Sequence, residues 1–94
     1  MEQHGYIEDK ARYLARLKRI EGQIRGLQRM VDEDQYCIDV LTQISAVNSA
    51  LRGLGLALLD DHMRHCVAHA VHQGDEEADV KFKEVSEAVA RFAR

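Results

Sequence analysis

The sequence predicts an all-α fold built from three helices. Its 94 residues contain no proline, the residue that most strongly breaks a helix. Ala, Leu, Arg, Glu and Gln, which favour helix, are common, whereas aromatic residues make up only 5% of the chain. Apolar residues recur at alternating spacings of three and four, the pattern of helices that bury one face. A chain of this length predicts a single domain, residues 1–94, whose limited core favours oligomerisation.

The first helix is expected to begin near Glu8 or Asp9, because acidic residues stabilise a helix N-terminus. Residues 1–8 are expected to be flexible. An apolar seam with heptad spacing then follows, made by Tyr13, Leu17, Ile20, Ile24, Leu27 and Val31. The polar run 32–35 is expected to end this helix.

The second helix is expected to run from near Tyr36 to about His72, with Gly74 as its C-terminal cap. It carries two apolar stripes, so it is expected to pack against more than one neighbour. One stripe comprises Cys37, Leu41, Ile44, Asn48, Leu51, Gly55, Leu58 and His62, and the other includes Val40, Val47 and Leu54. A third helix is expected after an acidic link, 75–77, with an inner face formed by Val80, Glu84, Val85, Ala88 and Phe92.

Charge is distributed unevenly along a chain whose formal net charge is -3. Residues 10–30 hold seven basic side chains and one acidic one, whereas residues 31–61 hold six acidic side chains and one basic one. The first helix therefore carries a basic face formed by Arg12, Arg16, Lys18, Arg19, Arg25 and Arg29. Such a stripe is typical of contacts to a phosphate backbone, and a solvated helix face is the alternative. No helix-turn-helix, zinc-finger or basic-zipper spacing is present.

The sequence shows neither a signal peptide nor an apolar stretch long enough to cross a membrane, so a cytoplasmic protein without a membrane partner is expected. In that compartment, its two cysteines favour metal or redox chemistry over a structural disulfide.

Cys37, His62 and Cys66 form the candidate metal site. His62 and Cys66 are one helical turn apart, a spacing that allows both to hold one ion. Cys37 lies about seven turns earlier, on the same face of a continuous helix but roughly 37 Å away. If this helix packs antiparallel against its copy, Cys37 of one subunit lies beside His62 and Cys66 of the other, which gives two equivalent sites per dimer. Two buried structural cysteines are the alternative.

Two thiolates and one imidazole form a soft set of three ligands. Thiolates select Cu(I), whereas Zn(II) normally requires a fourth ligand, so a trigonal Cu(I) ion is the best fit. A further histidine stripe is either a second metal site or a solvated face, and it comprises His65, His69 and His72.

Four motifs are shared with a known family: the run 19–26 (RIEGQIRG), the Tyr36–Cys37 pair, the run 41–47 (LTQISAV) and His62-x-x-x-Cys66. On these motifs, and from Lys10 to Phe92, the chain resembles the copper-sensitive operon repressor family, the CsoR/RcnR group of bacterial metal sensors. The resemblance implies three-helix subunits in an antiparallel homodimer, two of which form a disc-shaped homotetramer. It also implies that the apo-protein binds double-stranded operator DNA and that metal binding releases it.

The ligands of the family's copper branch correspond to Cys37, His62 and Cys66. The nickel and cobalt branch usually has His in place of Cys66 and adds an N-terminal His, whose position is occupied here by Gly5, next to His4. A persulfide-sensing branch keeps both cysteines but lacks the residue that corresponds to His62.

The resemblance also implies roles for residues around these ligands. Tyr36 and Glu84 correspond to a Tyr and a Glu that lie around the copper site and orient its His. Arg16 corresponds to a DNA-contacting arginine, with Lys18 and Arg19 on the same helix. The family's second such arginine has no match in register, and Arg52 lies one residue away.

The sequence therefore predicts a Cu(I)-responsive transcriptional repressor of copper resistance or efflux genes, and no enzyme. The runner-up is a Ni(II)- or Co(II)-responsive repressor, and a copper buffer or chaperone without a DNA role is a third possibility. A thiol enzyme that uses Cys37 or Cys66 with His62 as its base is disfavoured, because the sequence indicates no oxyanion hole or substrate pocket.

Overall fold

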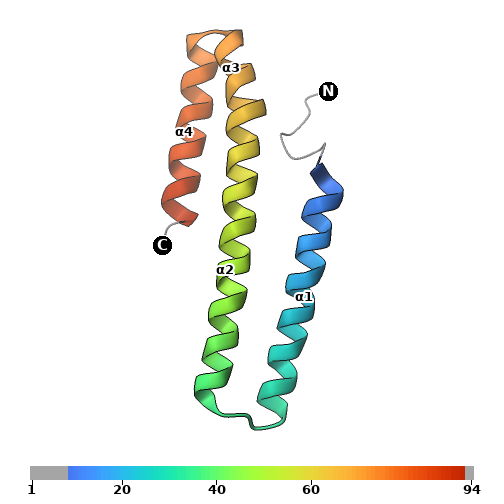
Figure 1. The fold of residues 1–94 in the computed structure, drawn as a ribbon. Helices are drawn as coiled ribbons and strands as arrows, with labels where there is room; N and C mark the ends of the chain where they lie inside the picture. The colour runs from blue at the N-terminus through green and yellow to red at the C-terminus, as the bar shows by residue number, and fades with distance from the viewer. Residues whose placement is uncertain (1–8, 93–94) are drawn as a thin grey trace. The chain divides into compact units, whose positions relative to one another are not determined.

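The all-α prediction is confirmed by the computed structural model, which describes residues 9–92 except for the side chain of Val67. In chain order these residues form α1 (Lys10–Asp32), α2 (Cys37–Asp61), the π-helical segment η2 (His62–Val67), α3 (Ala68–Gln73) and α4 (Asp75–Phe92). The predicted second helix corresponds to α2, η2 and α3 together (Figure 1). Residues 1–8, for which flexibility is expected, lie outside the described residues. The described chain divides into two compact units, residues 9–56 and 57–92, and the prediction of a single domain stays a prediction.

The first unit is a helical hairpin in which α1 leads through a tight turn into α2 (Figure 1). Asp34 has a φ of 56°, a left-handed conformation that aspartate tolerates better than most residues. The amide of Glu33 donates to the carbonyl of Arg29 at 2.9 Å, and the amide of Gln35 donates to that of Met30 at 3.0 Å. These bonds end α1 within the polar run, as predicted.

The core of this hairpin comes from one face of each helix. Tyr13 and Ile20 are buried on α1, and Val47 and Leu54 are buried on α2. The two members of each pair are separated by the same number of residues, so the pair on α1 can face the pair on α2 in an antiparallel hairpin. The α2 stripe that contains Val47 and Leu54 is thus the buried one. The other predicted stripe stays exposed in the single chain, at Leu41 (57%), Ile44 (39%) and Leu51 (42%).

In the second unit, η2 and α3 both contact α4, and Ala70 and Ala78 are buried. Gly74 joins α3 to α4 with a φ of 125°, a conformation that residues with a side chain rarely adopt. The amide of Gly74 donates to the carbonyl of Val71 at 3.4 Å, and the Gly74 carbonyl accepts from the amide of Ala78 at 3.0 Å. The predicted cap at Gly74 is therefore present, and it reverses the chain.

The structure corrects three details of the predicted helices. The second helix is not regular throughout, because its segment His62–Val67 is π-helical. Residues 75–77 are not a link but the first turn of α4, where carboxylates interact favourably with the helix dipole. The inner face of α4 is formed by Ala78, Lys81 and Val85, whereas four residues predicted to face inward are exposed, namely Val80, Glu84, Ala88 and Phe92.

Candidate metal centre and DNA-binding face

His62 and Cys66 both belong to η2, and both side chains are half-buried. A π-helix bonds residue i to residue i+5, so its turn holds about one residue more than an α turn. Two residues that are four apart are separated by slightly more than one turn in an α-helix and by slightly less than one turn in a π-helix. His62 and Cys66 therefore still leave the helix on the same side, as the sequence predicts. Because η2 contacts α4, a movement of either side chain can be transmitted to the last helix.

Cys37 is the first residue of α2 and is exposed. Both cysteines are free thiols, so neither is held in a disulfide. Among residues 9–92 of one chain, no three His, Cys, Asp or Glu side chains form a group that could hold a metal ion. The site shared by Cys37 of one subunit and His62 and Cys66 of another stays a prediction.

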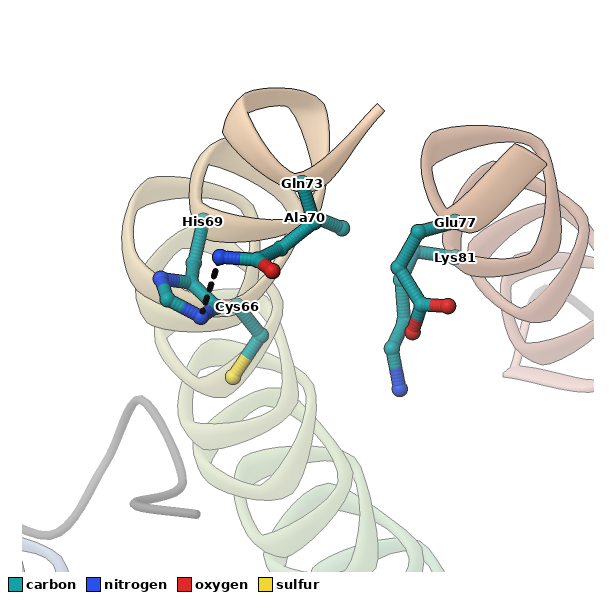
Figure 2. A pocket seen from close by; sticks show the side chains of 6 residues that line it. All are labelled: Cys66, His69, Ala70, Gln73, Glu77 and Lys81. Atoms are coloured by element: carbon teal, nitrogen blue, oxygen red, sulfur yellow. Dashed lines mark hydrogen bonds between the residues drawn. The ribbon is translucent and has the colours of Figure 1, made fainter. Parts of the chain in front are cut away.

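A pocket of about 270 Å³ lies next to Cys66, between the end of the second helix and α4 (Figure 2). Six residues line it: Cys66, His69, Ala70, Gln73, Glu77 and Lys81. His69 and Gln73 form a side-chain hydrogen bond of 3.5 Å on one wall, and Glu77 and Lys81 form the other. Sequence reasoning missed this polar wall, although the one-turn spacing of Glu77 and Lys81 on an amphipathic helix could have indicated it.

Lys81 connects this pocket to Glu84. Its ammonium lies 3.7 Å from a carboxylate oxygen of Glu84, and its side chain is only 23% exposed, whereas that of Glu84 is 53% exposed. Glu84 is thus an accessible carboxylate on the helix that contacts η2. Tyr36, the other residue expected around the metal, is 69% exposed immediately before α2.

The basic residues of α1 fall into two groups, those that have a carboxylate partner and those that do not. Arg12 pairs with Asp9 at 3.6 Å, and Arg25 pairs with Glu21 at 2.9 Å, so carboxylates partly neutralise both arginines. Arg16, Lys18, Arg19 and Arg29 have no carboxylate partner among the described residues. Their charges are therefore available to an anionic ligand.

Arg16 differs from the other basic residues of α1, because it is half-buried. Its terminal nitrogen Nη2 lies 3.3 Å from the point where a side chain at Gly53 would begin. The structure thus brings Arg16 of α1 to the turn of α2 that also carries the exposed Arg52. Sequence reasoning missed this approach, because it joins two residues that lie far apart in the chain.

The three histidines of the second stripe, His65, His69 and His72, are all exposed. They form no three-ligand group among residues 9–92 of one chain, and a second metal site and a solvated face both stay predictions. In the described part of the chain, no helix is both long and apolar enough to cross a membrane.

Three comparisons place the chain among known proteins. The family model for metal-sensitive transcriptional repressors matches residues 9–91. The copper-sensing transcriptional repressor RicR of Mycobacterium tuberculosis is 58% identical over 91 residues, which cover 97% of this chain and 95% of that protein. The copper-sensing transcriptional repressor CsoR of Bacillus subtilis is 53% identical over 74 residues, which cover 79% of this chain and 73% of that protein.

A solved structure agrees with these sequence comparisons. The crystal structure of the copper-sensing repressor CsoR with Cu(I) from Geobacillus thermodenitrificans matches with a TM-score of 0.86 and 43% identity, over 94% of this chain and 90% of that one. The family model, the RicR relative and the solved CsoR structure each match nearly the whole chain. The chain therefore belongs to the family of metal-sensitive transcriptional repressors, which are regulators of transcription and not enzymes.

Proposed function

We propose that the protein is a Cu(I)-responsive transcriptional repressor that binds operator DNA in its apo form and releases it on binding Cu(I). The observation that carries the proposal is the donor set. His62 and Cys66 leave one turn of η2 on the same side, and Cys37 is a free, exposed thiol. The chain is also 58% identical to a copper-sensing repressor. Such a sensor would act in the cytoplasm and would control copper resistance or efflux genes.

The chemistry of these side chains fits Cu(I). Two thiolates and one imidazole supply three soft ligands, and Cu(I) accepts a three-coordinate site, whereas Zn(II) normally requires a fourth ligand. Neither cysteine is in a disulfide, so both sulfurs are available for ligation. Bound Cu(I) would supply a strong bond between elements that are otherwise separate, and this is the change that the repressor would sense.

The exposed stripe of α2 supports the proposed assembly. Leu41, Ile44 and Leu51 are large apolar side chains with exposed fractions of 39–57% in the single chain. An antiparallel pairing of this stripe with its copy would bury all three and would place Cys37 of each subunit at the η2 segment of the other. We therefore propose an antiparallel homodimer that supplies two complete sites and pairs further into a homotetramer.

DNA binding is assigned to the basic residues that lack a carboxylate partner. Arg16, Lys18 and Arg19 supply positive charge from α1, and Arg52 supplies it from α2. Cations that neutralise backbone phosphates release condensed counterions, which makes the affinity strongly salt-dependent. The recognised partner is therefore duplex DNA, contacted largely through its backbone.

The alternatives are less well supported. A Ni(II) or Co(II) sensor would prefer more nitrogen and oxygen ligands than two cysteines and one histidine provide. A copper buffer without a DNA role leaves the unpaired cations of α1 unexplained and does not fit a family of transcriptional repressors.

The decisive experiment titrates the reduced protein anaerobically with Cu(I), Ni(II) and Zn(II) and measures the operator affinity of each form. We expect one Cu(I) per subunit, X-ray absorption that shows three ligands including two sulfurs, and release of DNA by Cu(I) alone. A nickel site with four to six ligands rich in nitrogen, together with release by Ni(II), would favour the nickel alternative. Copper binding without any DNA affinity in the apo form would favour the buffer.

A further inference from the structure

We infer that Gly53 is a positioning residue for DNA binding: because it has no side chain, the guanidinium of Arg16 can lie against α2 beside Arg52. The inference rests on the proposed repressor function, since it concerns the same DNA contact. It adds a residue without charge to the two arginines already assigned to DNA binding, Arg16 of α1 and Arg52 of α2, which together we call the clamp.

The contact between Arg16 and Gly53 is closer than a side chain at position 53 would allow. The Arg16 nitrogen Nη2 lies 3.3 Å from the Cβ position of Gly53, which is inside ordinary van der Waals distance. An alanine there would push the guanidinium away by a few tenths of an ångström, and a longer side chain would occupy its place. Arg16 is half-buried, whereas Lys18 and Arg19 are exposed, and this difference agrees with the placement of its guanidinium against α2.

The placement matters because it orders a flexible cation before any ligand arrives. A free arginine loses rotamer freedom when it binds a phosphate, and a guanidinium already held against a helix loses less. No described carboxylate occupies the donors of Arg16, so its planar fork remains available for two hydrogen bonds to one phosphate.

Arg52 provides the second cation of the clamp. Consecutive residues leave an α-helix about 100° apart, so Arg52 leaves the same turn of α2 as Gly53, about a quarter of the way around the helix from the position that Arg16 covers. Arg52 is exposed and has no carboxylate partner among the described residues. Two cations on neighbouring turns of different helices repel each other, and a polyanion such as the DNA backbone relieves that repulsion.

The test compares substitutions at Gly53 with a matched glycine. Gly26 lies inside α1 with nothing within 4 Å of its Cβ position, so Gly26→Ala brings the same gain in helix propensity without touching Arg16. The affinity of the apo-protein for operator DNA is measured over a range of salt concentrations for Gly53→Ala, Gly53→Gln, Gly26→Ala and Arg16→Ala. Thermal midpoints and Cu(I) stoichiometry are measured in parallel, because a folding or metal defect would appear there.

We expect the affinity to fall in the order wild type, Gly53→Ala, Gly53→Gln. The glutamine variant should approach the loss of roughly tenfold expected when one charge-assisted contact per site is removed. Its salt dependence should flatten by about the amount seen for Arg16→Ala. Gly53→Gln should add nothing in the Arg16→Ala background, since the contact is already gone. Gly26→Ala should bind DNA as the wild type does.

The outcomes separate this inference from the proposed function. If Arg16→Ala weakens DNA binding but Gly53→Gln does not, or if their effects add fully, Gly53 does not position Arg16 although the repressor function stands. If the wild-type apo-protein does not bind operator DNA at all, the proposed function fails and this inference fails with it.

Discussion

Replacing Glu84 with alanine should leave Cu(I) binding intact but remove much of the copper-driven release from DNA. A metal ion can shift a conformational equilibrium only if it favours one state over the other. His62 has two ring nitrogens, and when one holds the metal, the other can donate a hydrogen bond. Glu84 is an exposed carboxylate on α4, the helix that contacts η2, and we expect it to accept that bond.

To bond His62, Glu84 must give up its present partner, and the structure indicates how much free energy that costs. Glu84 now pairs with Lys81 at 3.7 Å, a long ion pair whose carboxylate is 53% exposed. Such pairs contribute about 0–1 kcal/mol, because water and salt screen them. A hydrogen bond to a charged acceptor contributes roughly 1.5–3 kcal/mol, and allosteric coupling is typically about 1–3 kcal/mol. Glu84 can therefore leave Lys81 for His62, and losing that bond would remove most of the coupling.

The assay measures operator affinity with and without saturating Cu(I). We expect the ratio of the two affinities to fall by roughly tenfold in Glu84→Ala, since 1.4 kcal/mol corresponds to a factor of ten. Glu87→Ala is the matched control, because it removes the same charge from an exposed position on α4 without breaking the ion pair of Glu84. Lys81→Met should keep or increase the copper response, because it removes the competing partner. If Glu84→Ala releases DNA as fully as the wild type, the coupling runs through other residues.

Three further predictions test the assembly, the fold and the DNA contact. Mixing Cys37→Ala subunits with Cys66→Ala subunits should restore one intact Cu(I) site per heterodimer, and a mixed dimer that binds no Cu(I) would exclude a site shared between subunits. Gly74→Ala should destabilise the protein by about 1–3 kcal/mol, because alanine is strained at a φ of 125°; a thermal midpoint that does not fall would contradict this. Arg16→Ala and Arg19→Ala should each weaken DNA binding and flatten its salt dependence without changing copper stoichiometry, and unchanged affinity in both would move the interface away from α1.

The sequence by itself determined the helices and the chemistry of the candidate ligands. Apolar spacing, the absence of proline and the polar run 32–35 fix where the chain is helical and where α1 ends, because these features act over a few residues. The same local geometry places His62 and Cys66 one turn apart. Residue types alone then indicate a soft metal, since two thiols and an imidazole have the same ligand preference in any fold.

Tertiary structure decided which faces of these helices are covered. Periodicity shows that α2 has two apolar stripes, but only packing against α1 determines that the stripe with Val47 and Leu54 is the buried one. Propensity cannot foresee η2, because a π-helical turn involves the same residue types as an α turn and differs in its hydrogen bonds. Likewise, the approach of Arg16 to Gly53 joins two residues that are distant in the sequence, and it exists only once the hairpin has formed.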